Sequence, residues 1–156
     1  MNNKIKEIAR ISIIASLYVL LTIFNPFSYD SVQFRISEIL MFLCCFKKEY
    51  VISLTIGCFI SNFFSSMMLY DIFFGTIATM IAGILMYKTK NIFISWIYPV
   101  VLNAIIVGFE LSLVFNTSFL LNLMWVGLGE LVVMIIGLII FIGIRKRDYF
   151  KNLFLQ

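Results

Sequence analysis

The segment Val32-Gln33-Phe34-Arg35-Ile36-Ser37-Glu38-Ile39-Leu40 places polar side chains inside an apolar stretch, and the rest of the chain is interpreted around it. Read as an α-helix, it stacks Gln33 over Ser37, since residues three and four apart share a face. It stacks Arg35 over Glu38 in the same way. Such a polar ladder is costly in lipid unless it faces protein, water or a ligand. We therefore expect the remaining helices to build a cup that this ladder helps to line.

The composition is that of an integral membrane protein. The chain has 156 residues, of which 62% are hydrophobic and 13% are charged, whereas a soluble domain carries about 25% charged residues. It contains no histidine, so the commonest general base and metal ligand is absent. We predict no enzymatic activity, no metal and no cofactor. The three cysteines lie in apolar runs without metal-site spacing, and we interpret them as inert thiols: Cys44, Cys45 and Cys58.

Apolar runs predict one domain, residues 1–156, that forms an all-α bundle of six transmembrane helices in the lipid bilayer. The second span must extend beyond its purely apolar part, Ile36–Phe46, which is shorter than the roughly 17 residues that a bilayer requires. Pro99 is expected to bend the fifth span, and Asp71 to cap the fourth. The predicted spans are Ile8–Phe24, Val32–Lys48, Tyr50–Met68, Asp71–Tyr87, Asn91–Phe115 and Ser118–Ile144.

The basic residues predict the orientation of these spans. In the six-span arrangement, 11 of the 12 Lys and Arg residues fall on one side of the membrane, and Arg35 is the exception. Positive residues favour the cytoplasmic side, so both termini are predicted to be cytoplasmic. The net charge of +4 is thus explained by topology, and we predict no nucleic-acid binding. The 11 residues are Lys4, Lys6, Arg10, Lys47, Lys48, Lys88, Lys90, Arg145, Lys146, Arg147 and Lys151.

Three carboxylates fall inside the predicted spans, at Glu38, Glu110 and Glu130. Ionisable groups inside spans are rare and require a reason. One reading is structural: Arg35 neutralises Glu38, and buried asparagines tie the helices together. That reading leaves an excess of negative charge, which favours a cationic or donor-rich ligand in an outward-facing pocket. Two aromatic residues are candidates to stack on a flat ring, Phe34 and Trp125.

Four motifs, in this order, resemble the QueT family of substrate-binding (S) components of energy-coupling factor transporters. The resemblance covers nearly the whole chain. One departure is the segment 62–68, which lacks the glycines common at this turn in family members. The motifs are Gln33-Phe34-Arg35-Ile36-Ser37-Glu38, Asp71-Ile72-Phe73-Phe74-Gly75-Thr76-Ile77-Ala78-Thr79, Asn103-Ala104-Ile105-Ile106-Val107-Gly108-Phe109-Glu110-Leu111 and Gly127-Leu128-Gly129-Glu130-Leu131.

The resemblance implies uptake of queuosine precursors or queuine, which are 7-deazaguanine bases, across the plasma membrane. It also implies partners: a transmembrane coupling protein and two ATPases. The sequence contains no Gly-rich phosphate loop ending in Lys-Ser/Thr, so ATP is expected to be hydrolysed by those ATPases. Small residues of the first helix are expected to meet the coupling protein, namely Ala9, Ser12, Ala15 and Ser16.

The same resemblance gives roles to the polar residues. Glu110 or Glu130 is expected to accept the adjacent N–H donors of a guanine-like edge, and another acid to meet a ligand amine. Polar amides are expected to complete the ring contacts, and Arg35 to orient Glu38. The predicted substrate-binding set is Gln33, Phe34, Arg35, Glu38, Asn62, Asp71, Asn103, Glu110, Trp125 and Glu130.

Two alternatives remain open at the level of sequence. One is a proton-coupled carrier of small solutes that uses Glu110 and Glu130 as a relay, although no inverted repeat is evident. The other is a scaffold subunit that binds no substrate. A scaffold explains the small-residue spacing of the helices but has no use for intramembrane acids on one side.

Overall fold

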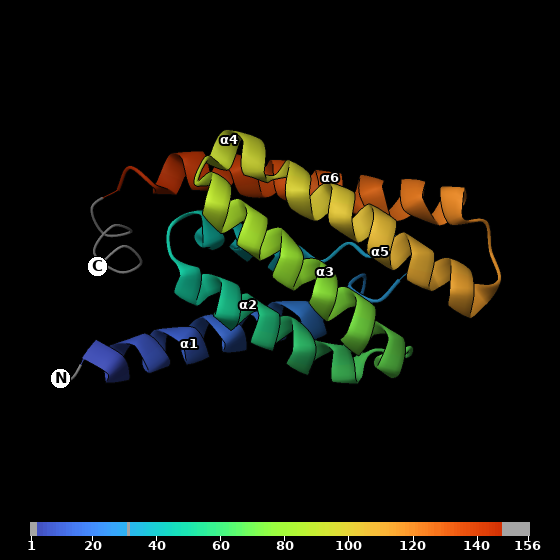
Figure 1. Cartoon of the computed structure of the whole chain (residues 1–156), viewed down its shortest axis with the longest axis horizontal. Coiled ribbons are helices and arrows are strands. Elements are labelled where there is room, and N and C mark those ends of the chain that lie inside the picture. The colour runs from blue at the N-terminus through green and yellow to red at the C-terminus, as the bar shows by residue number, and fades with distance from the viewer. Residues whose placement is uncertain (1–2, 31, 148–156) are drawn as a thin grey trace.

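The structure is a computed structural model, and it describes residues 3–30 and 32–147. Within these residues the chain forms six α-helices and two 3-10 helices and no strand, which confirms the all-helical class. In chain order the elements are α1 (Asn3–Ile23), η1 (Ile36–Cys45), α2 (Lys48–Ser61), η2 (Asn62–Phe64), α3 (Met68–Thr89), α4 (Ile92–Ser95), α5 (Ile97–Phe115) and α6 (Phe119–Ile144), as Figure 1 shows.

Three helical segments are long and apolar enough to cross a membrane. They are Met68–Thr89, Ile92–Phe115 and Phe119–Ile144, with mean hydropathies of 1.8, 2.1 and 2.6. These segments correspond to the predicted fourth, fifth and sixth spans. The total of six spans stays a prediction, since α1, η1 and α2 are not among the segments that are long and apolar enough to cross a membrane.

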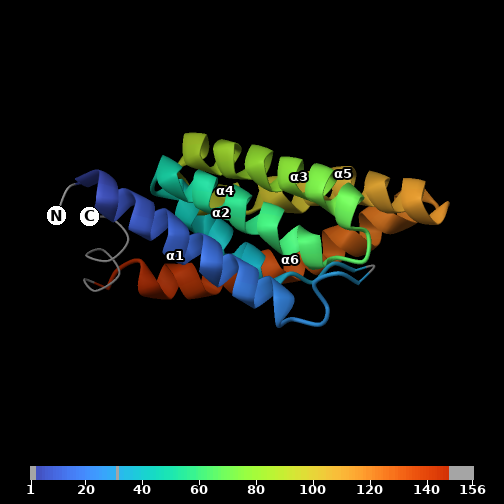
Figure 2. The same cartoon turned by 90° about the horizontal axis from the view of Figure 1, so that it is seen from below.

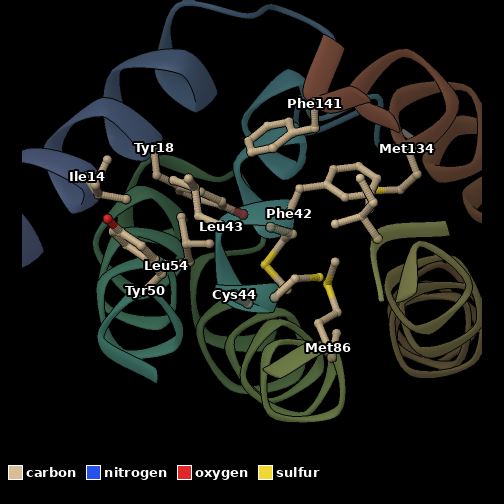
Figure 3. Close-up of a cluster of buried hydrophobic side chains, with 14 of the residues drawn as sticks. Ile14, Tyr18, Phe42, Leu43, Cys44, Tyr50, Leu54, Met86, Met134 and Phe141 are labelled. Atoms are coloured by element: carbon tan, nitrogen blue, oxygen red, sulfur yellow. The ribbon is translucent and has the colours of Figure 1, made fainter. Parts of the chain in front are cut away.

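The centre of the bundle is η1, which packs against α1, α2, α3 and α6. Apart from Ser37 and Glu38 its sequence is apolar, and seven of its ten residues are buried, as expected for a helix enclosed by other helices. Figure 3 shows Phe42, Leu43 and Cys44 pointing from η1 into the surrounding side chains. The ring of Phe42 lies 5.3 Å from the ring of Phe141 on α6, measured between centroids. The apolar core is therefore arranged around the predicted second span.

The conformation of this second element corrects the sequence prediction. Gln33 has a left-handed backbone (φ 48°), and Arg35 is extended, so the helix begins only at Ile36. The expected stacking of Gln33 over Ser37 and of Arg35 over Glu38 is therefore wrong. The helix is also a 3-10 helix, whose rise of about 2.0 Å per residue lets ten residues cover roughly 20 Å. An α-helix of ten residues would cover only about 15 Å.

Two further boundaries differ from the prediction. The predicted span Tyr50–Met68 ends earlier, because α2 stops at Ser61 and a short 3-10 turn follows. The next helix begins at Met68, so Asp71 lies within its first turn and does not cap it. The carboxylate of Asp71 is instead bound by side chains from other segments, as described below. The backbone at this turn is therefore organised around a buried acid.

The fifth span is interrupted near its start. The α-helix stops at Ser95 and resumes at Ile97, with Trp96 between the two parts. Pro99 has no N–H to donate to the carbonyl of Ser95, which explains the break. The structure thus shows an interruption three residues before Pro99, and the predicted bend of the span stays a prediction.

The helix ends that carry basic residues lie at one end of the molecule. Figure 1 shows the start of α1, the junction of η1 with α2, the end of α3 and the end of α6 at the same end. Seen from below in Figure 2, α1 runs beside α2, and Arg10 on α1 lies 3.3 Å from the carboxylate of Glu49 on α2. Lys151 lies outside the described residues. The prediction of cytoplasmic termini is compatible with this grouping of charge but stays a prediction.

Glycines allow the closest helix contacts. A Cβ at Gly57 on α2 would lie 2.9 Å from Cβ of Tyr18 and 3.0 Å from the carbonyl oxygen of Ala15, both on α1. Small residues permit this approach where the hydrophobic effect does not drive helices together. At Gly143, near the end of α6, a Cβ would meet nothing within 4 Å.

We predict that Gly57→Ala destabilises the detergent-solubilised protein by about 1–3 kcal/mol, because the added methyl group overpacks the α1–α2 contact. Thermal unfolding measures the effect as a lower midpoint. Gly143→Ala is the matched control, and it should leave the midpoint unchanged or raise it, since alanine favours the helix. If the two variants have the same unfolding midpoint, the close approach of α1 and α2 at Gly57 is contradicted.

Candidate functional site

A buried ion pair lies where the segment before η1 meets α3. Nη2 of Arg35 lies 3.1 Å from Oδ1 of Asp71, and both side chains are at most 5% exposed. Nε of Arg35 donates to the backbone carbonyl of Ser28 at 3.0 Å. The hydroxyl of Ser65 donates to the other carboxylate oxygen of Asp71. Arg35 thus pairs with Asp71 and not with Glu38, which corrects the role expected for it.

Glu38 is held instead by the first helix. The hydroxyl of Tyr18 on α1 donates to Oε1 of Glu38, and Oε2 has no partner. Nearby, the hydroxyls of Thr22 and Ser37 are 2.7 Å apart. Sequence reasoning missed Tyr18, although its spacing of four residues from Thr22, inside an apolar span, marks a polar strip on one helix face.

Two amide side chains lie beside the ion pair. Asn62 follows the end of α2, and its Nδ2 donates to the carbonyl of Asp71 at 2.7 Å. Gly75 makes room for both groups, since a Cβ there would lie 3.0 Å from Nδ2 of Asn62 and 3.6 Å from Nη1 of Arg35. Gln33 is 4% exposed, and its Nε2 has no hydrogen-bond partner.

The two acids of the last long helices are buried as well. Glu110 on α5 is fully buried, and it lies near enough to Asp71 and Arg35 for their charges to interact. Glu130 on α6 is 2% exposed, and it lies near enough to Glu38 for their charges to interact. The side chain of Asn103 hydrogen-bonds to the carboxyl group of Glu130. Six polar or charged residues, from the segment before η1 and from η1, α3, α5 and α6, thus converge in one buried region.

This region contains polar atoms that the protein itself does not satisfy. In the described part of the chain, eight buried side-chain atoms lack a hydrogen-bond partner. Five of them are carboxylate or amide oxygens, so acceptors dominate. Buried polar groups are normally paired, and such orphans mark a site that awaits donors. The atoms are Ser28 Oγ, Gln33 Nε2, Glu38 Oε2, Asn62 Oδ1, Thr76 Oγ1, both carboxylate oxygens of Glu110, and Glu130 Oε1.

The charges of the region are also unbalanced. Among the described residues, Arg35 is the one buried cation, and it faces four buried acids: Glu38, Asp71, Glu110 and Glu130. Uncompensated buried charge is strongly unfavourable. The arrangement therefore suits a ligand that supplies N–H donors or positive charge.

The structure does not bring the two predicted aromatic residues into this buried region. Trp125 is 48% exposed on α6. Phe34 is partly exposed, and its carbonyl accepts a hydrogen bond from Asn25 at 2.6 Å. Tyr29 is the aromatic residue beside the ion pair, with the Arg35 guanidinium 5.7 Å from its ring centroid.

The four small residues of α1 are divided between two environments. Ala15 is 5% exposed and packs against α2, whereas Ala9, Ser12 and Ser16 are exposed. A groove of about 500 Å³ runs between α1 and α2, and it is lined by Ser12, Ala15, Ser16, Val19, Leu20, Ile56 and Ile60. Ser12 and Ser16 lie on a different face of α1 from Tyr18, which contacts Glu38.

Comparison with known proteins gives two matches. A family model described as QueT transporter matches residues 8–146. The Queuosine precursor transporter QueT of Lactococcus lactis subsp. cremoris (strain MG1363) is 33% identical over 162 residues, which cover 93% of this chain and 95% of that protein. No solved structure matches the chain.

We predict that Asp71→Asn lowers the free energy of unfolding by about 3–5 kcal/mol, because it leaves Arg35 buried without its ion-pair partner. Chemical or thermal unfolding in detergent measures the loss. Glu49→Gln is the control, since it removes the more exposed Arg10–Glu49 pair and should cost roughly 1 kcal/mol or less. If Asp71→Asn destabilises the protein less than Glu49→Gln does, the buried Arg35–Asp71 pair is not the more stabilising of the two ion pairs, and the prediction is wrong.

Proposed function

Because the chain belongs to the QueT transporter family, we propose that it is the substrate-binding component of an energy-coupling factor transporter that imports queuosine precursors. The substrate is a 7-deazaguanine base, bound in the buried polar region formed by η1, α3, α5 and α6. The observation that carries this proposal is the excess of unpartnered acceptors there. A deazaguanine base supplies several adjacent N–H donors, which carboxylates bind strongly.

Glu110 is the residue we assign to the guanine-like edge. Its two carboxylate oxygens are buried beside the carboxyl group of Asp71 and make no hydrogen bond of good geometry, so the ionised Glu110 side chain can accept two parallel N–H donors. Asn62 and Gln33 each have one unpartnered atom with which to complete contacts to the ring. Asp71 and Arg35 satisfy each other and serve to hold the site together.

The membrane arrangement belongs to the same proposal. Six segments cross the plasma membrane, both termini are cytoplasmic, and the pocket opens to the outside. Two observations support this: the basic helix ends lie together at one end of the molecule, and the Arg35–Asp71 pair lies at the start of α3, whereas the basic residues of that helix lie at its end.

The partners are a transmembrane coupling protein and two ATPases, which supply the energy of transport. The coupling protein docks on the face of α1 that carries Ala9, Ser12 and Ser16, where small exposed side chains permit close helix contact. Ala15 lies at the floor of the adjoining groove. ATP is hydrolysed on the partner ATPases.

The first test is direct binding. The purified protein alone should bind a 7-deazaguanine base in calorimetry, and Glu110→Gln should weaken binding by about 2–5 kcal/mol, because it removes a buried charge that pairs with ligand donors. Glu49→Gln, at the opposite end of the molecule, is the control and should bind normally. Normal binding by Glu110→Gln would remove Glu110 from the site, and failure of the folded wild-type protein to bind any such base would refute the substrate.

The second test separates the proposal from a proton-coupled carrier and from a scaffold. Cells that express the chain together with the coupling protein and the ATPases should accumulate labelled base. Uptake should stop when an ATPase carries an inactivating substitution in its phosphate loop, while binding by the purified chain persists. Uptake that continues and collapses only with the proton gradient would favour the carrier. A folded chain that binds no substrate, yet is needed to assemble the complex, would favour the scaffold.

A further inference from the structure

A groove of about 390 Å³ runs between α2 and α3, which pack side by side in Figure 1. One end of the groove lies beside Lys48, which begins α2, and Tyr87, which lies near the end of α3. Farther along it are Ile56 on α2 and Met80 on α3, whose side chains are both exposed. The groove therefore faces the surroundings of the bundle and not its core.

The length of this groove is apolar. Its polar residue between the two ends is Thr55, and the hydroxyl of Thr55 donates to the carbonyl of Val51 at 2.7 Å. The helices approach closely here, since a Cβ at Gly83 would lie 3.2 Å from Cγ1 of Val51. In a bilayer such a groove takes up an acyl chain, because an empty groove forfeits dispersion contacts. Acyl chains are alike, so the chain by itself does not select one lipid over another.

Two cations lie at one end of the groove. The stem of Lys48 lines it, and such a stem can lie along apolar surface while the ammonium reaches water. Lys90 caps α3 with a left-handed backbone (φ 53°), and its Nζ lies 5.3 Å from the ring centroid of Tyr87. Glu49, the acid next to Lys48, is paired with Arg10. Neither lysine forms an ion pair within the described residues.

We propose that this groove is a binding site for an anionic phospholipid, with an acyl chain between α2 and α3 and the phosphate at the end that carries Lys48 and Lys90. The inference goes beyond the proposed function and requires only that the chain lies in a bilayer. From Lys48 to Ile56 the groove covers about 12 Å along α2. That is most of the roughly 15 Å of hydrocarbon in one leaflet. Lysines grouped at a membrane surface attract anionic headgroups.

A second groove shows what the charge adds. It lies between α5 and α6, has a volume of about 440 Å³ and is lined by apolar residues alone, among them Ala104, Ile105 and Leu128. It can accept an acyl chain, but no cation lines it to select a headgroup. The α5–α6 groove is therefore a control of similar size within the same molecule.

The test measures phospholipid bound to the purified, delipidated chain in detergent, by native mass spectrometry. Phosphatidylglycerol should bind at least about fivefold more tightly than phosphatidylcholine with the same acyl chains. Lys48→Gln and Lys90→Gln should each weaken the binding of phosphatidylglycerol about fivefold and change that of phosphatidylcholine by less than about twofold. Lys6→Gln makes the same change of charge on α1, which does not line this groove, and it should leave both affinities unchanged.

A second pair of variants tests the acyl-chain part of the site. Met80→Trp places a bulkier side chain in the α2–α3 groove, and it should abolish the preference for phosphatidylglycerol. Ile105→Trp makes a comparable change in the α5–α6 groove and should keep that preference. The unfolding midpoints of both variants are measured alongside, so that a loss of binding is distinguished from a loss of folding.

Several outcomes would overturn the lipid site. Equal binding of the two lipids by the wild-type protein is one, and a preference that survives both Lys48→Gln and Lys90→Gln is another. Displacement of the bound lipid by glycerol phosphate, which has no acyl chain, would indicate a site for free phosphate instead. A double variant that binds phosphatidylglycerol normally but no longer assembles with the coupling protein would assign the groove to that protein. None of these measurements uses a base, so their outcome is independent of the proposed function.

Discussion

The ion pair between Arg35 and Asp71 is the constraint on which the rest of the structure depends. It joins the non-helical segment before η1 to the first turn of α3, in surroundings where neither charge is tolerable alone. Arg35 also fixes the backbone of the preceding loop through Ser28, and Asp71 fixes the following turn through Ser65. These contacts set where the central helix begins, and the remaining helices pack around that helix.

Using Arg35 in this way leaves the other buried acids without a cation of their own. Each of these acids lies within a helix. The hydroxyl of Tyr18 also restrains Glu38, and the side chain of Asn103 restrains Glu130. A site preorganised in this way gains affinity, because little ordering is needed when the ligand binds. The donor-rich base that we propose fits the excess of acceptors.

Tyr18 connects this site to the surface that we assign to the coupling protein. One face of α1 carries Tyr18 and Thr22, which contact η1 beside the acids. Another face carries Ser12 and Ser16, which border the open groove against α2. Helix α1 therefore contacts both regions, because residues four apart repeat along each face.

The sequence by itself determined the helical class, the long apolar segments of the second half and the family, since these follow from local composition and ordered motifs. It also identified most of the buried polar residues, because charge inside an apolar run is conspicuous. Only the tertiary structure decided their partners: Asp71 for Arg35, Tyr18 for Glu38, and exposure for Trp125. Gln33 has a left-handed backbone and a 3-10 helix follows it, so the polar side chains of that segment do not share the faces that an α-helix would give them. Such conformations are imposed by contacts with distant helices, which local periodicity does not encode.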